Sequence, residues 1–433
     1  NDFKQTFPFE LTNAQKRVSK EINNDIAKTS PMMRLVQGDV GSGKTAVALS
    51  SATKALDSGH QVVFMAPTTL LAQQHLESIK SYFPSHHNEI ALLTSGLRKK
   101  ERNEIIENIF LGKIKFLVGT HAVLQNDVIF KSLAMVVIDE QHRFGVNQRL
   151  TLTKKADGEL SAHQLTLTAT PIPRTLSMSI YANMDVSVIN ELPPGRLPIQ
   201  TSMVAISARN KLIKRVEKAI KKDSLVYWIC PLVEESETLD LSSVNERFDT
   251  LKESLGDKNV ALMHGKLSND KKKEAIFKFK SGKIKILIST TVIEVGVDVP
   301  DADIMIIENA ERFGLAQLHQ LRGRVGRSSK ESFCILLHKD KLTELSQERL
   351  SALCDSNDGF AIAEKDLEIR GPGEILGSQQ TGILPFRYAN LIRDNKYLAD
   401  TKNIAENIYD ADKEKANQLM KRWISGIISY ANA

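Results

Sequence analysis

The sequence predicts an α/β protein with two tandem parallel-sheet domains and a C-terminal helical appendage. Short runs rich in β-branched residues alternate with turns and helical patterns, and the same alternation resumes after a proline-rich break at residues 191–198. From about residue 341 the strand signals fade, and charged, helix-favouring sequence continues to the end. We therefore expect domains at 1–192, 193–340 and 341–433.

The expected strands are short apolar runs, each followed by a turn and a helical pattern. They lie at 33–36, 62–66, 116–118, 135–138 and 164–168 in the first domain, and at 225–229, 260–263, 284–288, 304–307 and 333–337 in the second. Three prolines and a glycine between them, at 193–198, exclude regular structure. We interpret this break as an interdomain linker.

The composition is that of a globular protein and excludes several classes. Its 433 residues are 42% hydrophobic and 25% charged, without an apolar run long enough for a membrane span or a start that resembles a signal peptide. Three cysteines without C-x-x-C spacing predict neither disulfides nor a zinc site. We expect a soluble intracellular protein, and the net charge of +6 permits a polyanionic partner.

Residues 38–45 form a phosphate-binding loop of the pattern G-x-x-x-x-G-K-T. The loop lies between the first expected strand and a helix-forming run at 46–56. Its backbone N–H groups can close on a polyphosphate, Lys44 can reach the outer phosphates, and the Thr45 hydroxyl can hold Mg²⁺. We expect a nucleoside triphosphate held by Gly38, Asp39, Val40, Gly41, Ser42, Gly43, Lys44 and Thr45. The alternative is a glycine-rich turn that merely precedes a helix.

Two acidic residues follow the expected strand at 135–138. Asp139 and Glu140 would stand at the carboxyl end of a parallel strand, where the ligand sites of open α/β sheets lie. We expect Asp139 to hold Mg²⁺ through its water shell and Glu140 to orient and deprotonate the water that attacks the γ-phosphate. Taken alone, the pair also fits solvated turn acids.

Two further motifs have both a structural and a functional interpretation. Thr12 and Gln15 form a T-x-x-Q capping box that suffices to open a helix, but a Gln shortly before a phosphate loop can also read an adenine edge. The local sequence favours the capping box. Thr168 and Thr170 follow a strand and form either a turn or a link between the nucleotide site and a nucleic-acid groove.

Small polar residues occupy three positions of the first domain that we interpret as strand exits. Free N–H groups and hydroxyls at such positions suit the phosphates of a nucleic-acid backbone, although ordinary helix capping explains each one locally. The residues are Pro67 and Thr68, then Thr94, Ser95 and Gly96, then Thr120 and His121. Together they predict a groove that follows a phosphate backbone.

Residues 317–327 concentrate three arginines with glycines between them. Arginine forks suit phosphate oxygens and the charge that builds during phosphoryl transfer. Because the second domain has no phosphate loop, we expect Arg324 and Arg327 to face the nucleotide of the first domain as arginine fingers, with Gln320 of the same run in the catalytic set. A solvated basic helix face is the alternative.

The segment 289–300 leaves another expected strand near the presumed cleft. Thr290 and Thr291 are candidates for contacts with nucleic-acid phosphates. Gly296 and Asp298 lie toward its end, where Asp298 can meet the ribose of the nucleotide or the arginines.

Taken in order, these segments resemble the motifs of superfamily 2 helicases, and the match is closer still to the bacterial RecG branch-migration helicases. The sequence segments that carry the resemblance are 34–45, 139–145, 168–175, 191–196 and 366–374, so the resemblance spans essentially the whole chain. The resemblance implies two RecA-like domains that close on ATP and Mg²⁺ and move along duplex DNA. It also favours the adenine-reading role of Gln15.

The resemblance further implies a translocation motif at 358–382, with Arg370, Gln379 and Gln380 as couplers between domain closure and DNA. The implied function is a monomeric, ATP-driven translocase and helicase in the bacterial cytoplasm, associated with the nucleoid. It would remodel stalled forks and migrate branched junctions, with a single-stranded DNA-binding protein as a candidate partner. Family members carry an N-terminal wedge domain, whereas here the motor begins almost at once, so we expect the motor portion of a longer protein.

Two rival functions remain open at this stage. The motor of a transcription-repair coupling factor shares the phosphate-loop pattern and the translocation motif, although Ser42 and Gln141 look more like the RecG wording. A nucleic-acid-binding module that uses ATP only as a clamp is the other rival. The intact set of Lys44, Asp139, Glu140 and Arg327 argues against it.

Overall fold

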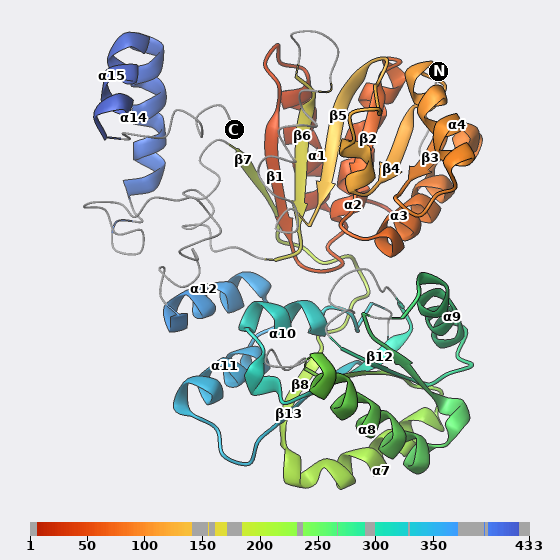
Figure 1. Ribbon diagram of the computed structural model, residues 1–433. Helices are drawn as coiled ribbons and strands as arrows, with labels where there is room; N and C mark the ends of the chain where they lie inside the picture. Colours follow the sequence, from red (N-terminus) through yellow and green to blue (C-terminus); the bar gives the residue numbers. More distant parts are fainter. Residues whose placement is uncertain are drawn as a thin grey trace.

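The structure is a computed structural model. It describes residues 7–140, 155, 161–170, 184–231, 237–265, 267–290, 299–327, 330–370, 394 and 397–423. Two separate parallel sheets, stacked one above the other in Figure 1, carry the two expected α/β domains. The fold class predicted from the sequence is confirmed.

The first domain is built on a sheet that has seven strands within the described residues, in the order β3-β4-β2-β5-β6-β1-β7. All of its ladders are parallel. The strands are β1 (Met33–Gly38), β2 (Gln61–Met65), β3 (Ile90–Leu93), β4 (Phe116–Gly119), β5 (Leu133–Asp139), β6 (His163–Thr168) and β7 (Asp185–Ile189). The five expected strands are present, and the sequence prediction missed the two edge strands β3 and β7.

Helices cover this sheet and bury both of its faces. They are α1 (Asn13–Ile26), α2 (Lys44–Asp57), α3 (Thr69–Tyr82) and α4 (Lys99–Phe110), with short 3₁₀ turns at Pro84–Glu89 and His121–Leu124. Adjacent residues of β2 belong to different cores, because Phe64 packs with Val36 and Val47 on one face while Val63 packs with Val136 on the other. Burial on both faces explains why the central strands are almost entirely apolar.

The second domain has a sheet of six strands within the described residues, in the order β10-β11-β9-β12-β13-β8. The strands are β8 (Gln200–Ala205), β9 (Leu225–Ile229), β10 (Val260–Met263), β11 (Ile286–Ser289), β12 (Ala302–Glu308) and β13 (Phe333–His338). The helices are α7 (Arg209–Ile220), α8 (Glu237–Leu255), α9 (Asn269–Lys280) and α10 (Leu315–Arg322), with 3₁₀ turns at Ile206–Ala208, Asp257–Asn259 and Ala310–Arg312. The prediction missed only the edge strand β8.

The residues of the C-terminal part that the structure describes are mostly helical, as expected. Their helices are α11 (Glu344–Asp355), α12 (Gly359–Arg370), α14 (Leu398–Ala411) and α15 (Lys413–Trp423). Helices α11 and α12 pack on α10 and on each other, and α12 lies between the levels of the two sheets (Figure 1). The first two helices of the appendage are therefore integrated with the second domain, and of the two α12 lies nearer the first domain.

Three smaller expectations can also be compared with the structure. Residues 190–199 contain neither helix nor strand, which agrees with the predicted linker. Cys230, Cys334 and Cys354 are unpaired, and burial raises the pKa of the Cys334 thiol to about 12. In the part of the chain that the structure describes, no helix combines the length and the apolar character needed to cross a membrane.

Candidate nucleotide site between the two domains

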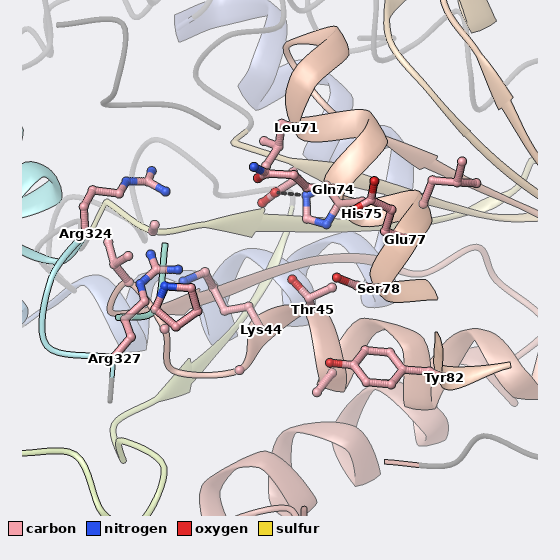
Figure 2. Close-up of a pocket in the computed structure, with 18 of the residues that line it drawn as sticks. Lys44, Thr45, Leu71, Gln74, His75, Glu77, Ser78, Tyr82, Arg324 and Arg327 are labelled. Carbon is pink, nitrogen blue, oxygen red and sulfur yellow. Dashed lines mark hydrogen bonds and ion pairs between the residues drawn. The ribbon is translucent and has the colours of Figure 1, made fainter. Parts of the chain in front are cut away.

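A cavity of about 1280 Å³ lies between the phosphate loop and the second domain. It gathers most of the residues predicted to bind or hydrolyse a nucleotide, namely Gln15, Val40, Gly41, Gly43, Lys44, Thr45, Asp139, Glu140, Arg324 and Arg327. In Figure 2, Lys44 and Thr45 lie on the first domain, while Arg324 and Arg327 extend from the second. Both domains therefore contribute to a single site.

The phosphate loop connects the end of β1 directly to the start of α2. Gly41 and Gly43 have φ values of +79° and +83°, which side chains rarely adopt, and a Cβ at Gly43 would also collide with the amide of Gln15. The Nζ of Lys44 folds back and donates to the carbonyl oxygens of Gly38 and Asp39, both at 2.8 Å. Burial lowers the pKa of Lys44, while the charges of the nearby carboxylates oppose this shift.

Gln15 joins helix α1 to the phosphate loop. The predicted capping box is confirmed, because Gln15 Oε1 accepts from Thr12 N at 2.9 Å and Thr12 Oγ1 accepts from Gln15 N at 3.3 Å. The same buried amide donates from Nε2 to the carbonyl of Ser42 at 2.8 Å. These contacts use one of the two N–H donors and one of the two lone pairs of the amide, and the adenine role of Gln15 stays a prediction.

The two predicted acids lie in different electrostatic environments. Asp139 is the last residue of β5, and its Oδ2 is 2.9 Å from Nε2 of His75 on α3, the contact drawn as a dashed line in Figure 2. Burial alone would raise the pKa of Asp139, but His75 and Lys44 hold it below its ordinary value. Burial and the charge of Asp139 raise the pKa of Glu140 to about 7. Neighbouring carboxyls whose pKa values are pushed apart are typical of acid–base sites.

Glu140 also has a strained backbone. Its φ of +53° lies in the left-handed region, which costs a non-glycine residue about 1 to 3 kcal/mol. The Ala169 N–H, just after β6, lies 3.5 Å from Glu140 Oε2. This backbone conformation directs the side chain into the cavity, where Lys44 and Arg324 lower its pKa against the effect of burial.

The structure divides the arginine-rich run of the second domain into two groups. Arg324 and Arg327 line the cavity, and Arg327 is close enough to lower the pKa of Lys44. Arg322 instead is only 2% exposed and donates from Nη1 to the carbonyls of Leu353 and Ser356. Arg322 therefore attaches α10 to the end of α11 in the C-terminal part, while Arg324 and Arg327 line the cavity.

Gln320 contacts the first domain outside the phosphate loop. Its Nε2 donates to Oγ1 of Thr170, and the Thr170 N–H donates to Thr168 Oγ1 at 3.2 Å. These contacts connect α10 with the end of β6, beside the residue that reaches Glu140. Thr170 thus links the two domains in the structure, whereas the catalytic role of Gln320 stays a prediction.

The three polar strand exits of the first domain meet at one edge of its sheet. Ala66 N donates to Gly119 O at 2.9 Å and Thr120 N to Leu93 O at 3.3 Å, which brings the ends of β2, β3 and β4 together. Thr68 is the N-cap of α3, as the local alternative expected. The exposed residues of this edge are Thr68, Ser95, Gly96 and His121; Pro67 is partly exposed, and Thr94 and Thr120 are buried.

Some predicted residues cannot be placed fully. Thr290 follows β11, is 1% exposed, and donates its N–H to Met263 O at 3.4 Å. Arg370 ends α12. Thr291, Gly296, Asp298, Gln379 and Gln380 lie outside the described residues.

Sequence reasoning missed three side chains that organise the site. His75 holds Asp139, His319 lies 2.6 Å from Asp39, and Arg196 of the linker donates to Val40 O at 2.6 Å and to Gly326 O at 2.8 Å. Each contact joins segments that are distant in sequence. The sequence held one signal for these contacts: Asp39 places a carboxylate inside the phosphate loop, and a buried carboxylate needs a partner.

Three family descriptions match successive parts of the chain. They are the DEAD/DEAH box helicase at residues 12–179, the helicase conserved C-terminal domain at 209–329, and ATP-dependent DNA helicase RecG, domain 3, C-terminal, at 356–422. The ATP-dependent DNA helicase RecG of Haemophilus influenzae is 48% identical over 433 residues, 100% of this chain. The chain belongs to the RecG family.

Other RecG proteins give the same result. RecG of Escherichia coli K12 is 48% identical over 100% of this chain. A solved RecG bound to a three-way DNA junction is 42% identical, with a TM-score of 0.74 over 90% of this chain and 51% of that chain. The present chain spans 62% of the length of the Haemophilus influenzae protein and 63% of the length of the Escherichia coli protein.

More distant structures share only the fold. Saccharomyces cerevisiae Dbp5, solved with RNA and ADP BeF3, is 17% identical and has a TM-score of 0.58 over 84% of this chain and 88% of that chain. At this identity the likeness supports the tandem RecA-like architecture alone. The match to RecG proteins, by contrast, extends through the C-terminal helices up to residue 422.

Proposed function

We propose that this chain is the ATP-driven motor of a helicase that translocates on duplex DNA, remodels stalled replication forks and branch-migrates Holliday and other branched junctions. The observation that carries the proposal is the composite cavity, where the phosphate loop faces Arg324 and Arg327 of the other domain. Because neither domain holds all of these groups, hydrolysis there depends on how the domains are placed. The RecG relative solved with a three-way junction supports branched DNA as the substrate.

ATP and Mg²⁺ are the proposed occupants of the cavity. Lys44 would exchange the neutral carbonyls of Gly38 and Asp39 for phosphate oxygens, to which an ammonium forms stronger, charge-assisted bonds. Among the described residues, no group of three or more His, Cys, Asp or Glu side chains could hold a metal. This fits an ion held largely by phosphates, with Thr45 and Asp139 completing its shell; when bound, Mg²⁺ neutralises charge on the transferred phosphoryl group.

The acids and arginines have distinct proposed roles. Glu140, with its pKa of about 7, can accept a proton from the attacking water near neutral pH. Asp139, kept ionised by His75, is the better ligand for a cation. Arg324 and Arg327 would stabilise charge in the transition state, and Gln15 would read the adenine.

The DNA path is proposed to follow the polar edge of the first sheet. Exposed Thr68, Ser95, Gly96 and His121 suit phosphate contacts, with Pro67, Thr94, Thr120, Thr290 and Thr291 shaping the same path. Thr168, Thr170 and Gln320 would couple it to the nucleotide site, and Arg370, Gln379 and Gln380 would couple it to the C-terminal part. We propose that Gly296 and Asp298 contribute to nucleotide binding.

The functional units and the setting are also proposals. We assign residues 1–192 and 193–340 to the two RecA-like domains and 341–433 to the translocation motif and C-terminal helices. Family membership supports a motor in the bacterial cytoplasm at the nucleoid. We also propose that the chain is monomeric, which sedimentation of the chain alone tests and self-association contradicts. The proposed partner is a single-stranded DNA-binding protein; sedimentation of the mixture tests this, and the absence of a complex contradicts it.

ATP turnover with different DNAs tests the motor function. We expect forked and linear duplex DNA to raise the turnover of the 433-residue chain by about tenfold or more, which corresponds to about 1.4 kcal/mol of the activation barrier. Glu140→Gln serves as the hydrolysis-deficient control. A full-length RecG relative is measured in parallel. Any preference for a junction that only this relative shows depends on residues outside the 433-residue chain. Turnover insensitive to every DNA would overturn the proposal.

A further inference from the structure

Asp39 carries a charge that its position in the phosphate loop does not call for. It follows β1 directly, and the loop pattern leaves this position open to any residue. A carboxylate repels the polyphosphate that such a loop holds. A negative side chain there therefore needs another explanation, which its contacts provide.

Both carboxylate oxygens of Asp39 are bound by groups from the other half of the chain. Oδ1 accepts from Nε2 of His319 on α10 at 2.6 Å, and Oδ2 accepts from the backbone N–H of Gly359, the first residue of α12, at 3.3 Å. Burial alone would raise the pKa of Asp39, but His319 and the Gly359 N–H hold it below its ordinary value. Asp39 is thus an anion that joins the loop to two helices.

The proton on His319 can be assigned from its second contact. Nη2 of Arg322 lies 3.1 Å from Nδ1 of His319. A guanidinium only donates, so Nδ1 accepts and the ring N–H is on Nε2, from which it is donated to Asp39. The His319 side chain is 6% exposed, so water competes little with either contact.

Arg322 continues this connection to the segment before α12. Its Nη1 donates to Leu353 O at 2.8 Å and to Ser356 O at 2.7 Å, at the end of α11, where carbonyl groups lack helical partners. Gly359 follows three residues after Ser356 and returns to Asp39. The contacts form a closed ring that begins and ends in the phosphate loop.

Lys44, the lysine of the phosphate loop, also contacts Asp39. Lys44 Nζ donates to the backbone carbonyl of Asp39 at 2.8 Å, while the side chain of Asp39 holds α12. A triphosphate draws the ammonium toward its own oxygens. The Asp39 peptide then loses a hydrogen bond while its carboxylate remains attached to α10 and α12, so a shift of the loop moves those helices.

We propose that Asp39 is a positioning residue that transmits occupancy of the phosphate loop to helix α12. This inference rests on the proposed function, because it takes ATP as the occupant of the loop. This coupling does not involve Arg324 or Arg327. It runs from the start of the phosphate loop to α12 and does not depend on contacts with the transferred phosphate. Helix α12 packs on α10 and α11 and lies between the two sheets, where such a shift can act (Figure 1).

Gly359→Pro removes the N–H that donates to Asp39 Oδ2. Proline is favoured at the first position of a helix, so α12 keeps a good N-terminus. Gly359→Ala is the matched control, because it adds a side chain but keeps the N–H. The readout is amide hydrogen exchange over residues 360–370, with and without a saturating non-hydrolysable ATP analogue.

We expect the analogue to change exchange in α12 by about fivefold or more in the wild type and in Gly359→Ala, and by less than about twofold in Gly359→Pro. All three proteins should bind the analogue with affinities within about threefold of one another. An equal exchange response in the proline and alanine variants would overturn the coupling. Exchange requires only nucleotide binding, so this outcome is separate from any failure of DNA-stimulated turnover.

A second pair of variants tests the ring from its other side and serves if Gly359→Pro does not fold. His319→Leu removes the donor to Asp39 Oδ1, whereas His319→Gln offers an Nε2–H at a similar reach. The exchange response of α12 should be lost in the leucine variant and retained in the glutamine variant. Equal responses contradict the coupling, and a wild-type chain that binds no nucleotide at all contradicts the proposed function itself.

Discussion

Glu140→Gln tests whether burial has tuned one acid of the site for catalysis. In the folded chain the pKa of Glu140 is about 7, compared with an ordinary value of 4.5. At pH 8 the wild type must therefore ionise a buried carboxyl that is easier to ionise in the unfolded chain. Glutamine has nearly the same shape and stays neutral at every pH.

The size of the effect follows from the two pKa values. A carboxyl whose pKa is raised by folding contributes stability below its unfolded pKa and loses that contribution as the pH rises through its folded pKa. At about 1.4 kcal/mol per pKa unit, the loss for Glu140 at pH 8 is about 3 kcal/mol. Part of this gain is lost in the variant, because an amide does not form the same hydrogen bonds as a neutral carboxyl. We therefore expect Glu140→Gln to stabilise the nucleotide-free chain by about 1 to 3 kcal/mol at pH 8 and by less than about 1 kcal/mol at pH 5.

Calorimetric unfolding at pH 5 and pH 8 measures this difference. A chain with two domains need not unfold in one step, so the comparison uses the transition that contains the first domain. Its midpoint should rise by about 2 to 4 °C per kcal/mol at pH 8. The substitution Glu104→Gln, at an exposed position on α4 of the first domain, controls for the loss of one carboxylate and should leave the midpoint unchanged.

Activity measurements on the same protein complete the test. ATP turnover of Glu140→Gln should fall by about 100-fold or more, and kcat/KM of the wild type for ATP should rise with pH around a midpoint near 7. A variant that is no more stable than the wild type at pH 8, or equally stabilised at both pH values, refutes the electrostatic reasoning. Near-normal hydrolysis removes Glu140 from the role of base.

Three further substitutions test other parts of the structure. Lys44→Ala should weaken binding of a fluorescent ATP analogue by at least about tenfold, since it removes the ammonium that faces the cavity, and unchanged affinity contradicts this. Arg327→Ala should lower DNA-stimulated kcat by about 10³-fold with ATP affinity little changed; a fall below about tenfold excludes an arginine finger. Asp25→Ala removes the nearest carboxylate of the buried Arg34, whose Nε lies 2.7 Å from Asp25 Oδ2. Glu21 and Asp185 remain 3.6 and 3.7 Å from the guanidinium, so the change should cost about 1.5 to 3 kcal/mol in thermal unfolding; a loss below about 0.5 kcal/mol contradicts this.

The predictable part of the fold consisted of its central strands. Runs such as 62–66 and 225–229 are continuous and apolar because both faces of these strands are buried. The missed strands β3, β7 and β8 lie at sheet edges, where they pair on one side only and include exposed or partly exposed residues. Because polar residues interrupt the apolar pattern of β7 and β8, these two strands stand out less from loops than β10, which is also at an edge but was predicted from its apolar run at 260–263.

The site was predictable wherever its chemistry lies in contiguous residues. A phosphate loop needs its glycines, its lysine and its helix at fixed spacing, and Asp139 and Glu140 need only to follow a strand. His75, Arg196 and His319 escaped prediction because their partners lie 64, 156 and 280 residues away in sequence. No local pattern records contacts of that kind.

The sequence by itself determined the tandem α/β architecture, the phosphate loop and the acidic pair, because each depends on the backbone and side chains of a few neighbouring residues. The sequence also named Arg324 and Arg327 as the arginines that face the nucleotide, and both line the cavity, but only the tertiary structure showed that Arg322 instead binds the carbonyl of Leu353. It also decided the pKa of Glu140 and the attachment of Asp39 to α12. Burial and distant charges set these properties, and both exist only once the chain has folded.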